Sequence, residues 1–347
     1  MQDDTINIIR GGVQRTNKNN RAMTTRIEIK NFKSIRHLVL KDCKRINLLI
    51  GKPNVGKSNI LEALTAFSLP YSRYINNKSL QQFIRCENES ELFYNGNMSK
   101  DIEIHTDSDR LVFRSNKTSH VSRLHGFLNG KPIVELYNLK IKQTGSEMPN
   151  KDVRSYFFPS PFQFENTGLK FLQPTMGCNL FSVLNSLENT KKEISDILAL
   201  YGLKLSFDQA GQQIKLFKSV SEESIYLVPF NSIADTLQRM MFYKIAVASN
   251  ENSILTFEEP EAHSYPPYIS KITTDIMHSE TNQFFITTHS PYVLNEFLEN
   301  KKDHLGIYLI DYKEGETSVK GLTEDEIDKA YQYGIDLFFN SEIFLNR

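Results

Sequence analysis

The sequence is poor in the residues that build a disulfide scaffold or a membrane span. Only three of its 347 residues are cysteine, at positions 43, 86 and 178, and their spacing matches no metal site. Such scattered cysteines argue against a disulfide-dense secreted fold and favour a reducing compartment. No stretch approaches the roughly 18 apolar residues that a membrane span needs. The first residues also lack the basic and apolar regions of a signal peptide. We therefore expect a cytoplasmic protein with no membrane partner.

A surplus of either charge is also missing, because 41 Lys and Arg residues balance 41 Asp and Glu residues. This balance excludes a uniformly basic nucleic-acid coat and an acidic disordered chain. The distribution is uneven, however. Residues 1–45 carry 11 basic and 4 acidic side chains, a surplus of 7, whereas residues 303–347 carry 4 and 10, a deficit of 6. Two interpretations follow: solvated faces of a globular protein, or a basic edge that contacts a polyanion such as DNA.

What the sequence does contain is an alternation of strands and helices. Apolar patterning predicts strands at 26–30, 37–40, 46–50, 253–257 and 283–288. Helical spacing predicts helices at 58–67, 179–201, 232–248 and 268–277, the third capped by Ser232 with Asp235 three residues on. A helix between two buried strands implies parallel pairing. We therefore predict an α/β fold with a mixed or parallel central sheet.

The expected organisation is a single main domain with short additions. A flexible extension is expected at 1–22, the main domain at 23–315 and an acidic C-terminal tail at 316–347. Within the domain we expect a β-rich insertion at about 90–170 and a helical insertion at about 178–220. The acidic tail is the segment that we would expect to contact a partner.

The segment GKPNVGKS, residues 51–58, satisfies the pattern G-x-x-x-x-G-K-[ST] between an apolar strand and a helix. Its glycines let the loop curl with N–H groups pointing inward, and the helix N-terminus adds partial positive charge. In this pattern Lys57 reaches the β- and γ-phosphates, and the hydroxyl of Ser58 coordinates Mg²⁺. We predict that a nucleoside triphosphate and Mg²⁺ bind here, with candidate binding residues Gly51, Asn54, Val55, Gly56, Lys57, Ser58 and Asn59.

A GTPase is one alternative. Residues 208–212 resemble the D-x-x-G motif of GTPases, and residues 300–303 resemble their N-K-x-D motif. The first motif lies too far from the P-loop, and its context predicts a hairpin turn between strands at 203–207 and 214–217. Asn300 ends a predicted helix instead of a buried strand. Spacing and context both disfavour a GTPase.

Two carboxylates and a histidine follow the two later buried strands. Glu258 and Glu259 come directly after the strand ILTF, at the strand end where α/β sheets build their sites. We predict that Glu258 holds the Mg²⁺ shell and that Glu259 accepts a proton from the attacking water. His289 follows the strand that we expect beside the carboxylates, and we predict that it senses the γ-phosphate.

Together these motifs resemble the ABC-type ATPases of the OLD and RecF group, which are relatives of the SMC heads. The resemblance rests on IEIKNFKSI at 27–35, the P-loop, EEPEAH at 258–263 and TTHSP at 287–291, in the family's order. It implies a P-loop NTPase fold of the ABC-ATPase-head type. By this resemblance Lys57 and Ser58 are the Walker A pair, Glu258 the metal-shell acid, Glu259 the general base and His289 the switch histidine.

The resemblance also implies ATP hydrolysis in a head-to-tail homodimer, in which a signature segment of one subunit completes the other subunit's site. The equivalent here is 231–239, where Ser232 would face a γ-phosphate in trans. The family's glycine is missing, and Asp235 stands near its place, where a carboxylate would repel phosphate unless it caps its own helix. Gln81 and Gln82 are candidates for the family's glutamine loop.

The predicted function is therefore an ATPase subunit that dimerises around Mg·ATP and signals its nucleotide state to an effector, such as a nuclease or toxin encoded nearby. The resemblance implies a role in bacterial anti-phage defence or DNA repair. The segment after His289 is too short for the nuclease domain of the OLD nucleases, so we expect any cutting to come from a partner. The alternative is a nucleotide-switched DNA-binding or scaffold protein with negligible hydrolysis.

Overall fold

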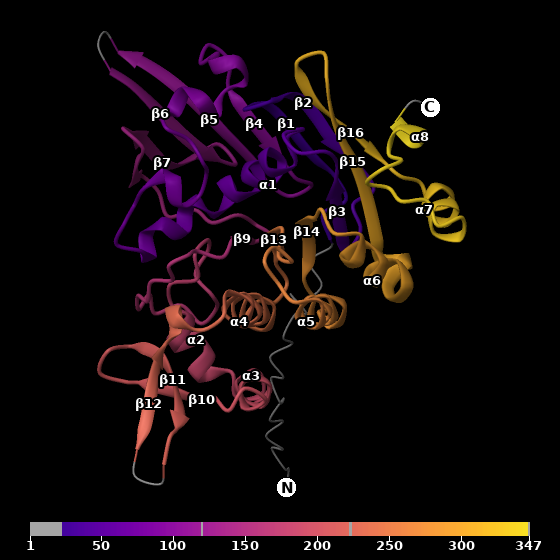
Figure 1. The fold of residues 1–347 in the computed structure, drawn as a ribbon. Helices are drawn as coiled ribbons and strands as arrows, with labels where there is room; N and C mark the ends of the chain where they lie inside the picture. The colour runs from indigo at the N-terminus through magenta and orange to yellow at the C-terminus, as the bar shows by residue number, and fades with distance from the viewer. Residues whose placement is uncertain (1–22, 119–120, 222–223, 346–347) are drawn as a thin grey trace, which may run out of the picture.

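The computed structural model describes residues 23–118, 121–221 and 224–345, so the expected extension at 1–22 lies outside the described residues. Three sheets form within them, and the predicted α/β fold class is confirmed (Figure 1). The seven-stranded antiparallel sheet has the order β2–β1–β4–β5–β6–β7–β8. The six-stranded sheet has the order β16–β15–β3–β14–β13–β9, and the small third sheet the order β10–β11–β12.

The strands of the seven-stranded sheet are β1 Ile27–Phe32, β2 Ile35–Leu40, β4 Ile102–His105, β5 Arg110–Thr118, β6 Val121–Leu128, β7 Lys131–Tyr137 and β8 Lys140–Gln143. Those of the six-stranded sheet are β3 Ile46–Ile50, β9 Val153–Tyr156, β13 Ile254–Glu258, β14 Gln283–Thr287, β15 Leu305–Lys313 and β16 Glu316–Gly321. The small sheet has β10 Lys204–Asp208, β11 Gln213–Ser219 and β12 Ile225–Pro229. The helices are α1 Lys57–Thr65, α2 Leu180–Ser186, α3 Glu188–Ala199, α4 Asp235–Ala248, α5 Pro266–His278, α6 Pro291–Lys301, α7 Glu324–Gln332 and α8 Glu342–Leu345. None of the described helices is long and apolar enough to cross a membrane.

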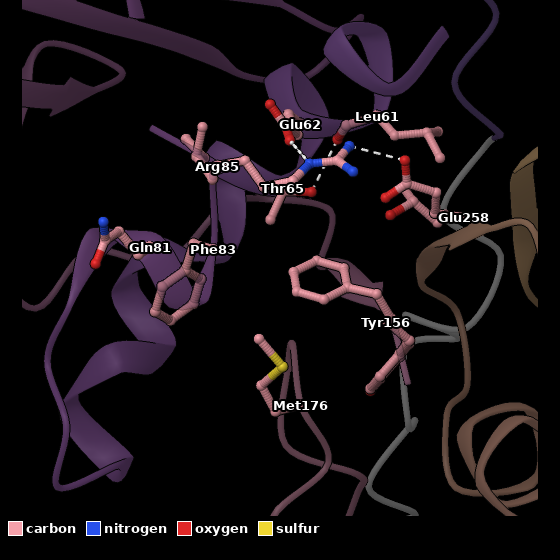
Figure 2. Close-up of a pocket in the computed structure, with 12 residues that line it drawn as sticks. Leu61, Glu62, Thr65, Gln81, Phe83, Arg85, Tyr156, Met176 and Glu258 are labelled. Carbon is pink, nitrogen blue, oxygen red and sulfur yellow. Dashed lines mark hydrogen bonds and ion pairs between the residues drawn. The ribbon is translucent and has the colours of Figure 1, made fainter. Parts of the chain in front are cut away.

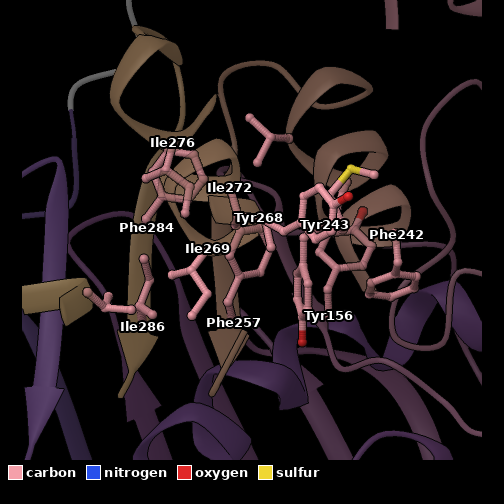
Figure 3. Close-up of a cluster of buried hydrophobic side chains, with 14 of the residues drawn as sticks. Tyr156, Phe242, Tyr243, Phe257, Tyr268, Ile269, Ile272, Ile276, Phe284 and Ile286 are labelled. Atoms are coloured by element: carbon pink, nitrogen blue, oxygen red, sulfur yellow. The ribbon is translucent and has the colours of Figure 1, made fainter. Parts of the chain in front are cut away.

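The central strands of the six-stranded sheet are buried on both faces, which explains their continuous apolar runs. β3, β14 and β13 pair in parallel. Alternate side chains point to opposite sides, so Phe284 and Ile286 of β14 join the core beneath α4 and α5, whereas Phe285 joins the core beneath α1. Figure 3 shows the first core, in which the rings of Tyr243 and Phe257 meet edge to face with centroids 5.1 Å apart. The sheet is therefore held by helices on both faces.

Two helix predictions were wrong in detail. The helix expected at 179–201 is two helices, α2 and α3, because the backbone leaves helical geometry at Leu187, where φ is −101° and ψ is 79°. The helix expected to start at Ser232 is α4, which begins at Asp235 with Ala234 as N-cap and no side-chain cap. Residues 230–232 form a separate 3₁₀ turn. Ser232 is therefore not the cap, and Asp235 is the first helical residue.

The expected insertion and tail also differ from prediction. The helical insertion contains the predicted hairpin, β10 and β11, as well as two helices, and β12 extends it. The acidic segment after 316 is part of the fold: β16 pairs with β15, and Ile327, Leu337 and Phe344 are buried in the main core. Hydrophobic burial therefore attaches this segment to the domain despite its charge.

β16 packs directly behind the P-loop. Gly56 has φ of 100°, and a Cβ atom there would lie 2.1 Å from the Thr317 Oγ1 atom. The Thr317 hydroxyl donates to the Val55 carbonyl at 2.9 Å and contacts the Ser34 hydroxyl at 2.6 Å. Asn59 Nδ2 donates to Ser34 Oγ at 2.6 Å. This chain of bonds joins the loop, the first helix, the β1–β2 turn and β16.

We predict that Thr317→Val lowers the free energy of unfolding by about 1–3 kcal/mol, because the buried Val55 carbonyl and the Ser34 hydroxyl each lose a partner. Thr317→Ser keeps the hydroxyl and is the matched control, with a smaller loss. Urea denaturation measures both values. Equal losses in the two variants would show that the hydroxyl does not brace the loop.

Candidate functional site at the ends of three parallel strands

The parallel register places three loops at one edge of the six-stranded sheet. Leu49 of β3 pairs with Thr287 of β14, and Thr287 pairs with Glu258 of β13. The P-loop follows β3, the Glu258–Glu259 pair ends β13, and His289 lies two residues after β14. This arrangement matches the expectation that His289 follows the strand beside the carboxylates.

These loops line a cavity of about 420 Å³. Most of the predicted site residues contribute to its wall: Asn54, Gly56, Lys57, Ser58, Asn59, Glu258, Glu259 and His289. Gly51 and Val55 belong to the same loop, and Val55 is buried beneath it. Ser232 is exposed and does not line the cavity. The structure thus brings most of the predicted residues together and leaves Ser232 exposed outside the cavity.

Lys57 and Ser58 occupy the start of α1. The Lys57 ammonium donates to the carbonyls of Gly51 and Lys52 at 2.8 and 2.7 Å. Burial lowers the pKa of Lys57, and the carboxylates of Glu259 and Glu258 oppose that shift. The Ser58 hydroxyl donates to Glu258 Oε1 at 2.5 Å, so the two predicted Mg²⁺ ligands already touch.

The donor set fits a magnesium ion. One hydroxyl and one carboxylate, completed by nucleotide phosphates and water, are the ligands that Mg²⁺ takes in such sites. Among the described residues there is no group of three or more His, Cys, Asp or Glu side chains that could hold a metal alone. A cation at Ser58 and Glu258 would therefore depend on phosphate oxygens for its remaining ligands.

Glu259 and His289 face each other across the cavity. Glu259 has φ of 42°, an uncommon backbone conformation for a side chain of its size. Its amide donates to the Thr287 carbonyl at 3.1 Å and to the Thr287 hydroxyl at 3.2 Å. His289 Nε2 lies 3.4 Å from Glu259 Oε1. Burial and the Lys57 charge lower the pKa of His289, and Glu259 opposes them, which favours the neutral imidazole.

Three charged residues of the site escaped the sequence prediction. Glu62 lies one helical turn after Ser58 on α1 and is 6% exposed. It accepts from Arg85 Nε at 2.6 Å and pairs with Lys33. Arg85 Nη2 also donates to Glu258 Oε1 at 2.8 Å, so its guanidinium bridges two carboxylates (Figure 2). The i,i+4 spacing from Ser58 could have identified Glu62, but no local pattern marks Arg85.

The candidate glutamines do not line this cavity. Gln81 and Gln82 form a 3₁₀ turn with Leu80, and Gln81 Nε2 donates to the Cys86 carbonyl at 3.0 Å. Gln81 lines a separate, more apolar cavity of about 300 Å³ (Figure 2). The residues that line both this cavity and the 420 Å³ cavity at the P-loop, called the nucleotide cavity below, are Glu62, Arg85 and Glu258. Arg85 is thus the polar residue of this segment that reaches the site.

Two further observations concern charges that the sequence analysis singled out. Asp235 Oδ2 accepts from Arg239 Nε at 2.8 Å on the same helix, so the carboxylate that would repel phosphate is neutralised locally. On the basic edge, Lys30 pairs with Glu28 at 3.0 Å, Arg36 lies 3.8 Å from Glu316, and Lys33 lies in the nucleotide cavity. The edge therefore offers a polyanion less free charge than the sequence count suggests.

A P-loop between a buried parallel strand and a helix, with acidic residues and a histidine at the next two strand ends, defines a P-loop nucleotide-binding domain. A family model described as "AAA ATPase domain" matches residues 23–219. The chain belongs to this family, whose P-loop domains bind nucleotide. A second model, described as "AAA domain, putative AbiEii toxin, Type IV TA system", matches residues 181–295.

Solved structures that resemble this chain include SMC head domains. One is an SMC head bound to the C-terminal winged-helix domain of ScpA, with 13% identity and a TM-score of 0.51, covering 90% of this chain and 100% of that one. Another is an SMC head with an extended coiled coil bound to the C-terminal domain of ScpA from Pyrococcus furiosus, with 12% identity and a TM-score of 0.54, covering 90% and 99%. The predicted ABC-head fold is confirmed by these matches.

A curated relative is similar over a short stretch only. An uncharacterized protein of Methanocaldococcus jannaschii is 51% identical over 45 residues, which are 13% of this chain and 20% of that protein. The match therefore spans about a fifth of the relative's length.

We predict that Arg85→Ala increases the affinity for Mn²⁺, used as a probe without nucleotide, by about fivefold, because the guanidinium no longer competes for Glu258. Arg85→Lys keeps the positive charge and is the control. Electron paramagnetic resonance of free Mn²⁺ measures the affinity. Equal Mn²⁺ affinity in all three proteins would mean that Arg85 does not shield the carboxylate.

Proposed function

We propose that this chain binds and hydrolyses Mg·ATP, dimerises head to tail around the nucleotide and passes its nucleotide state to an effector protein. The observation that carries the proposal is the meeting of Glu259 and His289, 3.4 Å apart, in the cavity that Lys57 and Ser58 also line. A general base, a neutral imidazole and a phosphate-binding lysine at one sheet edge suit phosphoryl transfer to water.

Each side chain then has a distinct task. Lys57 exchanges its two carbonyl partners for phosphate oxygens, and Ser58 and Glu258 hold the magnesium shell. Mg²⁺, when bound, would neutralise part of the phosphate charge. Glu259 accepts the proton of the attacking water, and the neutral imidazole of His289 donates a hydrogen bond to the γ-phosphate. Arg85, displaced from Glu258, adds positive charge on the same side.

Dimerisation is supported by the placement of the signature segment. Ser232 is exposed and outside its own chain's cavity, as a residue that acts in trans must be. The ion pair between Asp235 and Arg239 reduces the repulsion between the Asp235 carboxylate and a phosphate at this position. The backbone N–H groups at the start of α4, three residues after Ser232, lie at a helix N-terminus, which favours a phosphate. Together these features favour an active dimer over a scaffold with negligible hydrolysis.

The proposed partner is an effector such as a nuclease or toxin. The second matching model carries the description of a toxin in a toxin–antitoxin system, which favours a defence role over DNA repair. The SMC heads of similar fold were solved with a domain of a different protein bound. Both observations suit a nucleotide-binding subunit that works with a second protein.

We predict that Glu259→Gln lowers ATP turnover by about 10²–10⁴-fold, because the amide cannot accept the water proton. ATP binding persists in this variant, whereas Lys57→Ala loses it. Phosphate release and a fluorescent-nucleotide titration measure the two properties. If the parent protein releases no phosphate, or if Glu259→Gln turns over ATP at the parent's rate, the enzymatic proposal fails.

We also predict that Glu259→Gln with Mg·ATP elutes as a dimer from a sizing column, because trapped nucleotide joins two subunits. Adding Ser232→Arg keeps the protein monomeric, since a large side chain replaces a hydroxyl at the proposed contact. Monomers in both proteins would contradict the dimer. Dimers of the parent protein without phosphate release would instead favour the nucleotide-switched scaffold.

A further inference from the structure

Glu261 connects the carboxylate turn to the switch loop. It lies two residues after Glu259, and its Oε1 atom accepts from the Thr288 hydroxyl at 2.6 Å and from the His289 amide at 3.0 Å. These donors belong to the loop after the neighbouring strand, 27 and 28 residues along the chain. Glu261 does not line the nucleotide cavity. Its side chain thus holds the backbone of the switch residue from behind.

The surroundings of the Glu261 carboxylate make its burial unfavourable. Burial raises the pKa of Glu261, and the Thr288 hydroxyl and the His289 amide oppose the shift. Its second oxygen, Oε2, is buried and makes no hydrogen bond. A buried polar atom without a partner is unfavourable and calls for an explanation. The two hydrogen bonds at Oε1 offer an explanation, because they fix the position of the loop that contains Thr288 and His289.

A second set of bonds runs in the opposite direction. The Glu259 amide donates to the carbonyl and the hydroxyl of Thr287. Within the switch loop, the Ser290 amide also donates to the Thr288 hydroxyl at 3.0 Å. The Glu259 amide and the Glu261 carboxylate therefore each join the carboxylate turn to the end of β14 and the loop that follows it. Without Glu261, the bonds at Thr287 and the Glu259–His289 contact would remain, but the His289 amide would lose its carboxylate acceptor.

We propose that Glu261 is a positioning residue, which fixes the main chain of His289 so that its imidazole faces Glu259 and the nucleotide phosphates. The inference rests on the proposed ATPase function for its catalytic consequence. The contact itself, between Glu261 Oε1 and the His289 amide, does not depend on hydrolysis. Two measurements therefore distinguish a failure of the positioning role of Glu261 from a failure of the proposed ATPase function.

The first measurement is amide hydrogen exchange at His289, followed by NMR without nucleotide. Glu261→Ala removes the acceptor, and we expect exchange at His289 to rise about tenfold or more. Glu261→Gln keeps an oxygen acceptor, and exchange should stay within about twofold of the parent. Glu251→Ala, at an exposed position before β13, is the matched control. Equal exchange at His289 in the parent and in Glu261→Ala would overturn the proposal.

The second measurement is a double-mutant cycle on ATP turnover. We expect Glu261→Ala to lower kcat by about tenfold with little change in KM, and Glu261→Gln to keep kcat close to that of the parent. In a protein that already carries His289→Ala, adding Glu261→Ala should lower kcat no further. Additive losses would mean that Glu261 only stabilises the fold and would overturn the positioning role. If the parent turns over no ATP, the proposed function fails while the exchange measurement still decides whether Glu261 holds the loop.

Discussion

The in-register parallel pairing of β3, β14 and β13 is the constraint on which the rest of the structure depends. It aligns Leu49, Thr287 and Glu258 across three strands, so that the loops that follow them leave the sheet at one edge. Packing fixes this register, because a slip of one residue would exchange the faces on which Phe284 and Phe285 are buried. The hydrophobic cores on the two faces of the sheet therefore determine where the polar residues of the site meet.

The polar residues at this edge form a nearly balanced set of charges. Three acidic side chains, Glu62, Glu258 and Glu259, share the cavity with three basic ones, Lys33, Lys57 and Arg85. In this structure Lys57 donates to its own loop carbonyls, and Arg85 donates to Glu258. A polyanion with its cation would exchange these partners without a large change in net charge. Such an exchange would alter the contacts between α1, the Arg85 segment and β13.

The parts of the site that could be predicted from the sequence are short local motifs next to buried strands. The P-loop, Glu258, Glu259 and His289 each follow an apolar run, and strand order then places them together. The parts that escaped prediction depend on distant partners: Arg85 meets Glu258 across 173 positions, and Thr317 meets Val55 across 262. Local conformation caused the helix errors, since neither the break at Leu187 nor the late start of α4 has a Gly or Pro signal.

The uneven charge of the sequence has a structural counterpart within the chain itself. Arg36 and Lys44 from the basic N-terminal region, and Lys52 from the P-loop, lie near Glu316, Glu324 and Glu342 of the acidic C-terminal segment, at 3.8, 3.0 and 3.1 Å. Exposed pairs of this kind contribute at most about 1 kcal/mol each, so burial of Ile327, Leu337 and Phe344 holds the segment in place. The ion pairs add charge complementarity to this hydrophobic contact, and one of their residues, Lys52, belongs to the P-loop. The C-terminal segment is thus joined to the nucleotide site both through Lys52 and through Thr317 behind Gly56.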